Sequence, residues 1–129
     1  MRKVRFTNGE FYHVYNRGVD KRVVFPRDDD FERFLESMEA FNSTEPIGSI
    51  FVYSFSEKKT KRFPKLVNII CYCLNPNHYH LIIEQLRDNG VSEFMKRLGG
   101  GFTNYFNSKN KRSGALFQGR FKAIHINSN

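Results

Sequence analysis

Long hydrophobic runs are missing from this sequence of 129 residues, and cysteine is scarce. No segment approaches the roughly 18 consecutive apolar residues that a membrane-spanning helix needs, and the N-terminal MRKVRFTNGE lacks the apolar stretch of a secretory signal peptide. The only cysteines, Cys71 and Cys73, stand one residue apart in a β-prone run, which excludes a disulfide between them. We therefore expect a cytoplasmic protein with no membrane partner.

Acidic residues are absent from the C-terminal part of the chain, because none follows Glu93. The whole sequence has 21 Lys and Arg against 13 Asp and Glu, a net charge of +8. The cations after Glu93 are Lys96, Arg97, Lys109, Lys111, Arg112, Arg120 and Lys122. A field of one sign concentrates polyanions, so nucleic acid is the leading class of partner and no small-molecule substrate is expected. The alternative is a basic surface that serves only solubility.

Internal repeats and low-complexity tracts are also absent, and a chain of this length is too short for two domains. We expect one domain over residues 1–129. Apolar periodicity and turn residues predict strands at 11–18, 66–74, 78–85 and 115–126, and helices at 28–42 and 91–106. The order strand, helix, strand, strand, helix, strand predicts a ferredoxin-like α+β fold, βαββαβ, with an antiparallel sheet and two helices on one face.

Four details of these elements are also predicted. Residues 66–74 are apolar on both faces, which favours a central strand covered on each side. The GGG at 99–101 favours a kink or two shorter helices, and Gly119 a bulge in the last strand. Residues 42–65 favour an irregular or hairpin insertion around the β-prone IFVYSF, with a basic end that is either a solvated loop or a nucleic-acid contact.

Two histidines stand at the start of an apolar run in the stretch NPNHYHLIIEQ. Successive side chains of a strand point to opposite faces, so His78 and His80 share one face while Tyr79 lies on the other. Two imidazoles at this spacing can bind one divalent ion if a third ligand comes from elsewhere, and such an ion can polarise a phosphoryl oxygen. The histidine pair is therefore a candidate metal site.

Other interpretations of the pair stay open. An i, i+2 histidine pair is also typical of an ordinary half-exposed strand. A structural zinc site built from Cys71, Cys73, His78 and His80 is a further alternative. We expect instead that the two thiols are buried core residues of a strand, and the two-residue gap usual between zinc-binding cysteines is missing.

Three stretches of the sequence resemble one family. LNPNHYHLIIEQ, FMKRLGGGFTNYFNSKNKRSGALFQGRFKA and FYHVYNRGVDKRVVF are similar to the REP-associated tyrosine transposases and their insertion-sequence relatives, members of the HUH endonuclease superfamily. The resemblance implies a ferredoxin-like domain, usually a homodimer, that binds single-stranded or hairpin DNA. It implies that His78 and His80 bind a divalent metal, Mg²⁺ or Mn²⁺. A tyrosine then attacks the phosphodiester, leaving a 5′-phosphotyrosine and a free 3′-OH for strand transfer in DNA transposition.

The nucleophilic tyrosine of that family has no match in this sequence. In the family it lies on a further helix beyond the last strand, so we expect a chain shortened at its C-terminal end relative to the family. The tail AIHINSN would place Ala123 at the tyrosine position. Tyr105 is the one weak candidate, but it falls within the apolar stripe of the predicted helix at 91–106, which favours a core residue.

Candidate DNA contacts combine cations with short polar residues, as in the loop NSKNKRSG. They are Arg17, Lys109, Lys111, Arg112, Arg120 and Lys122. Ordinary solvation is the alternative for each of them. Three functions are therefore carried forward: a transposase-type endonuclease domain, a catalytically silent relative that only binds DNA, and a single-strand RNA-binding module, whose usual exposed aromatics the predicted strands lack.

Overall fold

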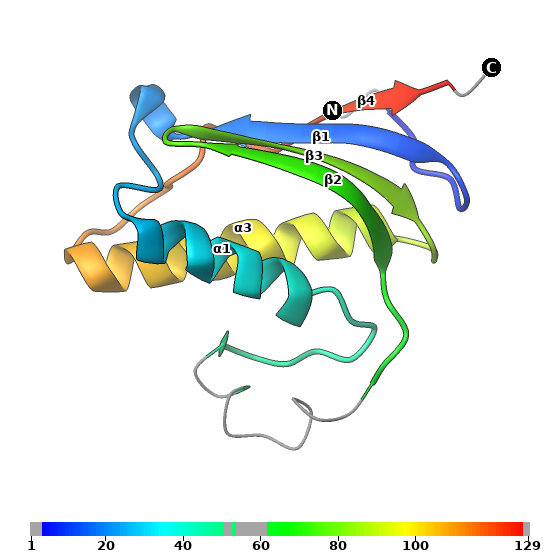
Figure 1. Ribbon diagram of the computed structural model, residues 1–129, viewed down its shortest axis with the longest axis horizontal. Coiled ribbons are helices and arrows are strands. Elements are labelled where there is room, and N and C mark those ends of the chain that lie inside the picture. The colour runs from blue at the N-terminus through cyan, green and yellow to red at the C-terminus, as the bar shows by residue number, and fades with distance from the viewer. Residues whose placement is uncertain (1–3, 51–52, 54–61, 128–129) are drawn as a thin grey trace.

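Four strands pair into one antiparallel sheet, and two long helices lie across one of its faces (Figure 1). The computed structural model describes residues 4–50, 53 and 62–127. Its elements are β1 (Phe11–Arg17), the short 3-10 helix η1 (Val19–Lys21), α1 (Asp28–Ala40), β2 (Val67–Asn75), β3 (His78–Gln85), α3 (Gly90–Asn110) and β4 (Lys122–Ile126). The strand order is β2-β3-β1-β4. This arrangement confirms the predicted ferredoxin-like α+β fold.

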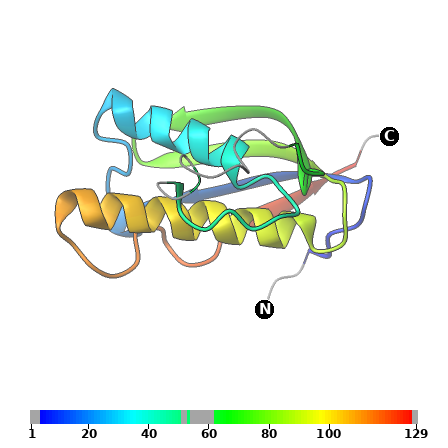
Figure 2. The ribbon, with the colours of Figure 1, turned by 90° about the horizontal axis from the view of Figure 1, so that it is seen from below.

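The core fills the space between the sheet and the two helices, which Figure 2 shows from the helix side. Alternate residues of the central strands face it and are almost fully buried: Tyr12, Val14, Tyr79, Leu81 and Ile83. Phe34 of α1 and Phe102 of α3 meet edge to face there, with ring centroids 5.3 Å apart. The predicted burial of Tyr79 is therefore confirmed. No helix among the described residues is long and apolar enough to cross a membrane.

The glycine triplet does not interrupt α3, which runs unbroken from Gly90 to Asn110, so the predicted kink is wrong. Each glycine costs a helix about 1 kcal/mol relative to alanine, but each fully buried apolar side chain of the core-facing stripe contributes about 1.5–3 kcal/mol. Packing therefore outweighs helix propensity. Gly101 also has a packing role, because a Cβ there would lie 2.6 Å from the Phe41 ring, whereas a Cβ at Gly99 or Gly100 would meet nothing within 4 Å.

The apolar run at 66–74 forms β2, which is an edge strand rather than the predicted central one. It pairs with β3 only, and the register shifts between Ile69 and Cys71. Ile70 and Tyr72 are consequently about half exposed, at 48% and 51%. Cys71 and Cys73 are exposed free thiols, so the prediction that they are buried is also wrong. The absence of β4 from this side of the sheet is what leaves β2 uncovered, because β4 pairs with β1.

The last predicted strand is shorter than expected, since only Lys122–Ile126 belongs to β4. Leu116 and Phe117 are buried, but they lie in the connection between α3 and β4, which explains their strand-like apolar pattern. Gly119 adopts a φ of +66° in that connection rather than a bulge within the strand. Left-handed backbone of this kind favours glycine.

The insertion at 42–65 is described only in part. Tyr53 donates its backbone N–H to the Ser49 carbonyl at 2.9 Å, an i to i−4 bond typical of a helical turn. The other residues of IFVYSF, and most of the basic end, lie outside the described residues, which include only Ile50 and Tyr53 of that stretch.

Candidate functional site

Two motifs that are far apart in the sequence are joined beside the end of β1. The buried Asn16 side chain donates to the Gly119 carbonyl at 3.1 Å and accepts the Arg17 backbone N–H at 2.9 Å. The Gln118 backbone N–H donates to the Arg17 carbonyl at 2.9 Å, and its side-chain oxygen accepts the Arg17 Nε–H at 3.0 Å. YNRG and FQGR therefore form one structural unit, in which the connection before β4 is held against the sheet.

The turn between β2 and β3 is also held against the backbone that follows β1. The Gly18 backbone N–H donates to the Asn77 carbonyl at 2.9 Å. A Cβ at Gly18 would collide with the Arg22 carbonyl oxygen, so only glycine allows this close approach. The start of β3, where the two histidines stand, is thus held by hydrogen bonds to the backbone that follows β1.

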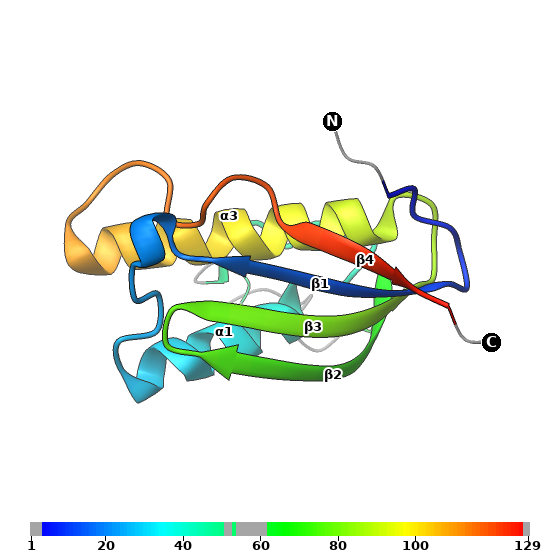
Figure 3. The ribbon, with the colours of Figure 1, turned by 90° about the horizontal axis from the view of Figure 1, so that it is seen from above.

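A cavity of about 570 Å³ opens at this junction. His78 and His80 line it, and both project from the sheet face away from the helices, the face seen in Figure 3. Three cations also line it: Arg17, Lys21 and Lys122. None of its lining residues within the described chain is a carboxylate. The cavity therefore combines imidazole nitrogens with a positive field, a combination suited to phosphate.

Hydrogen bonds orient both imidazoles. His78 Nδ1 lies 2.7 Å from Asn77 Oδ1, and because that oxygen only accepts, His78 carries its proton on Nδ1. His80 Nδ1 lies 2.8 Å from His13 Nε2, and the tautomer of His80 that donates to His13 likewise leaves Nε2 unprotonated. The two rings meet edge to face with centroids 5.2 Å apart. In these tautomers both Nε2 atoms carry a lone pair, held in the manner of oriented metal-binding histidines.

The surroundings keep His80 neutral. Burial, followed by the nearby His13 and His78, lowers the pKa of His80 below its ordinary value of 6.5. The His13 ring stacks on His80 at 5.0 Å between centroids, and Tyr15 stacks on His80 at 5.6 Å. A neutral imidazole is the form that binds a metal ion, so these neighbours favour the ligand form of His80 at neutral pH.

The histidines supply two ligands rather than a closed metal cage. Among residues 4–50, 53 and 62–127, no group of three or more His, Cys, Asp or Glu side chains is placed to hold a metal ion. Cys73 pairs with His80 across the sheet and Cys71 pairs with Ile82, but a four-ligand zinc group does not form. An open two-imidazole site fits a divalent ion whose other positions are filled by water or phosphate oxygens.

Tyr105 is not brought near the histidines. It stands on α3, on the opposite side of the sheet, and its hydroxyl donates to Asp30 Oδ1 at 2.8 Å. Lys109 Nζ donates to the same carboxylate oxygen at 2.9 Å. Burial, followed by the hydrogen bond to Asp30, raises the pKa of Tyr105, which disfavours a nucleophilic phenolate. Tyr105 therefore joins α1 to α3.

The candidate DNA contacts fall into separate groups. Arg17 and Lys122 lie at the histidine cavity, and Arg120 lines a neighbouring cavity. Lys109 forms ion pairs with Asp29 and Asp30 at 3.1 and 2.9 Å.

The other two cations stand near the end of α3. Arg112 donates to the Asn107 side chain and to the Ala115 carbonyl, which braces the loop after the helix. Lys111 is exposed at the C-terminal cap of α3. The structure thus places only two of the six predicted cations with the histidines.

Sequence reasoning missed six residues of the site: His13, Tyr15, Asn16, Lys21, Asn77 and Gln118. A signal for two of them exists, because alternation in FYHVYNR puts His13, Tyr15 and Arg17 on one face of β1. The pairing of Tyr15 with His80 depends on the register of β1 against β3, which the sequence does not reveal.

The fold and the oriented histidine pair define a ferredoxin-like domain with an open, cationic histidine site. The family model described as "Transposase IS200 like" matches residues 52–129, more than half of the chain, and the chain belongs to that family. No curated protein matches it.

Two solved structures share the fold. One is the REP-associated tyrosine transposase bound to a REP hairpin, with a TM-score of 0.64 and 14% identity over 100% of this chain and 64% of that chain. The other is a proposed transposase from Deinococcus radiodurans R1, with a TM-score of 0.60 and 12% identity over 99% and 88%. The chain thus spans less than two thirds of the length of the first.

Proposed function

We propose that the chain is a transposase domain that binds single-stranded or hairpin DNA at the histidine cavity and holds Mg²⁺ or Mn²⁺ there for phosphodiester cleavage and strand transfer. One observation carries the proposal. Two histidines, each oriented by a hydrogen bond at Nδ1, line a cavity that has three cations and no carboxylate among its described lining. The family supports DNA over RNA as the partner, as does the relative bound to a REP hairpin.

The proposed roles follow from the contacts. Arg17, Lys21 and Lys122 pair with phosphates and position the strand. His13 and Asn77 are positioning residues that fix the tautomers of His80 and His78. A divalent ion held by the two histidines would polarise the phosphodiester oxygen and stabilise the developing charge.

A second candidate function is DNA binding without cleavage. It is favoured by the position of Tyr105, whose hydroxyl is bonded to Asp30 on the far side of the sheet. Tyr15 is the one tyrosine within the described residues that lines the histidine cavity. A covalent step through Tyr105 is therefore not part of the proposal, which assigns the attacking hydroxyl of the cleavage step to no described residue.

Two further properties are proposed, the first from the length of the chain and the second from the resemblance. Residues 1–129 act as one domain, and the chain forms a homodimer. Sedimentation equilibrium tests the second property, with an expected mass of twice the 15.2 kDa of one chain. A concentration-independent monomer would contradict it.

The proposal is tested with a labelled hairpin oligonucleotide and Mn²⁺, by fluorescence anisotropy and denaturing gel. Wild-type protein is expected to bind at about 50 mM salt, and Arg17→Gln with Lys122→Gln to lower affinity about tenfold. Arg87→Gln is the control, because Arg87 has the same charge and lies on the turn between β3 and α3, outside the cavity.

Each outcome separates the functions. No binding to hairpin or single-stranded DNA by wild-type protein would sink the proposal. Binding with a covalent adduct supports the transposase, and binding without nicking supports the silent relative. An adduct that disappears in Tyr105→Phe would overturn the structural role assigned to Tyr105.

A further inference from the structure

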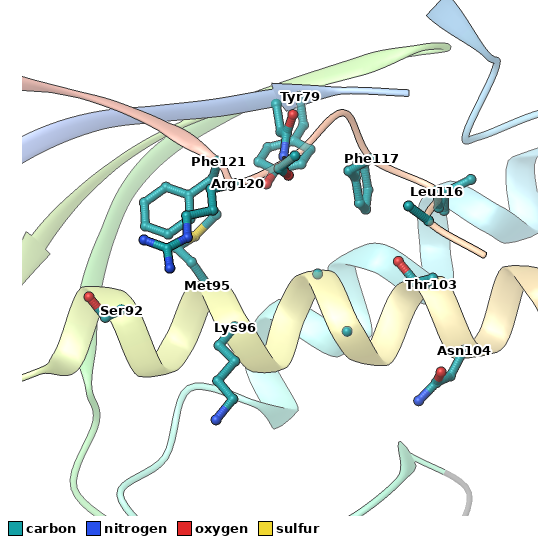
Figure 4. Close-up of a pocket in the computed structure, with 15 residues that line it drawn as sticks. Tyr79, Ser92, Met95, Lys96, Thr103, Asn104, Leu116, Phe117, Arg120 and Phe121 are labelled. Atoms are coloured by element: carbon teal, nitrogen blue, oxygen red, sulfur yellow. Dashed lines mark hydrogen bonds between the residues drawn. The ribbon is translucent and has the colours of Figure 1, made fainter. Parts of the chain in front are cut away.

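A second cavity, of about 700 Å³, lies between α3 and the connection that leads to β4 (Figure 4). Arg120 points from that connection toward α3, beside the Phe121 ring (Figure 4). Asn16 lines this cavity and the histidine cavity alike. Gln118 and Lys122 therefore line the histidine cavity, whereas Arg120 and Phe121 from the same stretch of chain line this second cavity.

Gly99 and Gly100 form part of the cavity lining. A Cβ at either position would meet nothing within 4 Å, so packing within the described chain does not require glycine at either. Glycine nevertheless lowers helix stability relative to alanine. A ligand whose backbone approaches α3 closely explains the two glycines, which packing within the fold does not explain.

A third cavity, of about 740 Å³, lies on the other side of the same stretch of α3. Lys96, Gly100 and Asn104 line both cavities, so the glycine positions form a saddle between them. In Figure 4 the Lys96 side chain extends from α3 on the side away from the connection. Neither cavity has an acidic residue in its described lining, whereas Arg120 lines the second cavity and Lys96 lines both.

We propose that a single DNA strand leaves the histidine cavity over residues 118–122, contacts Arg120, and crosses α3 at Gly99 and Gly100 with a phosphate at Lys96. The inference rests on the proposed function, because the strand begins in the histidine cavity. A single strand fits because the partly exposed Phe121 gives the groove an aromatic side chain beside its cations, the combination that binds unpaired bases and phosphates.

The first test adds a side chain at Gly100, between the two cavities. Gly100→Ala and Gly100→Gln both replace the glycine by a better helix former, so both are expected to raise the melting temperature. Only the longer glutamine side chain obstructs the groove. Gly100→Gln is expected to lower affinity for a hairpin with a single-stranded DNA tail about tenfold. Gly100→Ala is expected to lower it less than about twofold, because a smaller side chain removes fewer contacts between the strand and the groove.

The second test removes one charge at a time. Arg120→Gln and Lys96→Gln are each expected to weaken binding of the tailed hairpin and to reduce its salt dependence, by about 0.7 in the slope of log K against log salt for each lost phosphate contact. Arg87→Gln is the matched control with no cavity contact. These variants decide the matter even if Gly100→Gln does not fold.

The same hairpin without a tail distinguishes the two proposals. Groove variants that weaken only the tailed hairpin support the inference. Wild-type binding to both hairpins, with Gly100→Gln, Arg120→Gln and Lys96→Gln all unchanged, would overturn the inference and leave the proposed function standing. Failure of wild-type protein to bind either hairpin would overturn both. Tighter binding of an RNA tail than of the DNA tail would contradict the choice of DNA.

Discussion

His13 is the residue that fixes His80, through a hydrogen bond of 2.8 Å between His13 Nε2 and His80 Nδ1. Its ring also packs against Tyr15 in a tilted arrangement, with centroids 5.0 Å apart, so neither ring turns freely. Asn77 does the same for His78 through its side-chain oxygen. Each candidate ligand therefore has its own partner, which is the usual way that proteins set the direction and basicity of a metal-binding imidazole.

We predict that His13→Ala lowers the affinity for Mn²⁺ about tenfold, because His80 loses the hydrogen-bond partner that orients its ring. His13→Gln retains an acceptor and is expected to recover part of that affinity. Calorimetric titration without DNA measures both. Equal affinities for His13→Ala and wild-type protein would contradict the positioning role.

We predict that Tyr105→Phe lowers the free energy of unfolding by about 1–3 kcal/mol, because the Asp30 carboxylate loses one of its donors. The Mn²⁺ affinity is expected to stay unchanged, since Tyr105 is on the far side of the sheet from the histidines. Urea denaturation and calorimetric titration with Mn²⁺ check this. A stable variant with weakened metal binding would contradict it.

At the residue scale, the sequence correctly predicts the face of a strand on which a side chain lies, because alternation alone determines it. It put His78 and His80 on one face and Tyr79 on the other, as the burial of Tyr79 confirms. It did not reveal His13 as the partner of His80, because that contact depends on which strand pairs with β3 and in which register.

At the scale of elements, the junction of α1 and α3 is built on a buried carboxylate. Asp30 has a fully buried side chain and accepts from Lys109, Tyr105 and the Arg27 backbone N–H. The hydrogen bond to Asp30 is the main cause that raises the pKa of Lys109 above its ordinary value of 10.5. A basic group with a raised pKa stabilises the fold fully below its unfolded pKa, and the contribution is lost as pH rises.

We therefore predict that the free energy of unfolding falls as pH rises above about 10. The raised pKa of Tyr105 acts in the same direction, because the folded state favours its neutral form. Lys109→Met is expected to be less stable at neutral pH but to show a weaker loss on the alkaline side. Denaturant titrations at several pH values measure this. An unchanged alkaline slope in Lys109→Met would contradict the assignment.

The order of the elements could be predicted, but the order of the strands within the sheet could not. The apolar stripe of α3 follows from local periodicity, and its burial is confirmed. Residues 66–74 are apolar on both faces, yet they form an exposed edge because β4 pairs with β1 instead. Apolar character alone does not say which strands lie at the centre, since long-range pairing decides it.

At the scale of the whole molecule, acidic residues lie away from the cavities. The sequence has 13 acidic residues, yet none among the described ones lines the histidine cavity or either cavity beside α3. Asp29 and Asp30 of α1 form ion pairs with Lys109 of α3, and Glu93 forms an ion pair with Arg97 within α3. The described lining of these cavities therefore contains cations and no acids, in keeping with the net charge of +8 and as a polyanion-binding surface requires.

The most direct test of the account is the affinity for Mn²⁺ measured by calorimetric titration of the protein alone. We predict one site in wild-type protein, with affinity lowered at least about tenfold in His78→Ala and in His80→Ala. His125→Ala is the matched control, because His125 lies on β4 and bonds to Glu10 outside the cavity. Wild-type affinity in both His78→Ala and His80→Ala would contradict the assignment of the histidine cavity as the metal site.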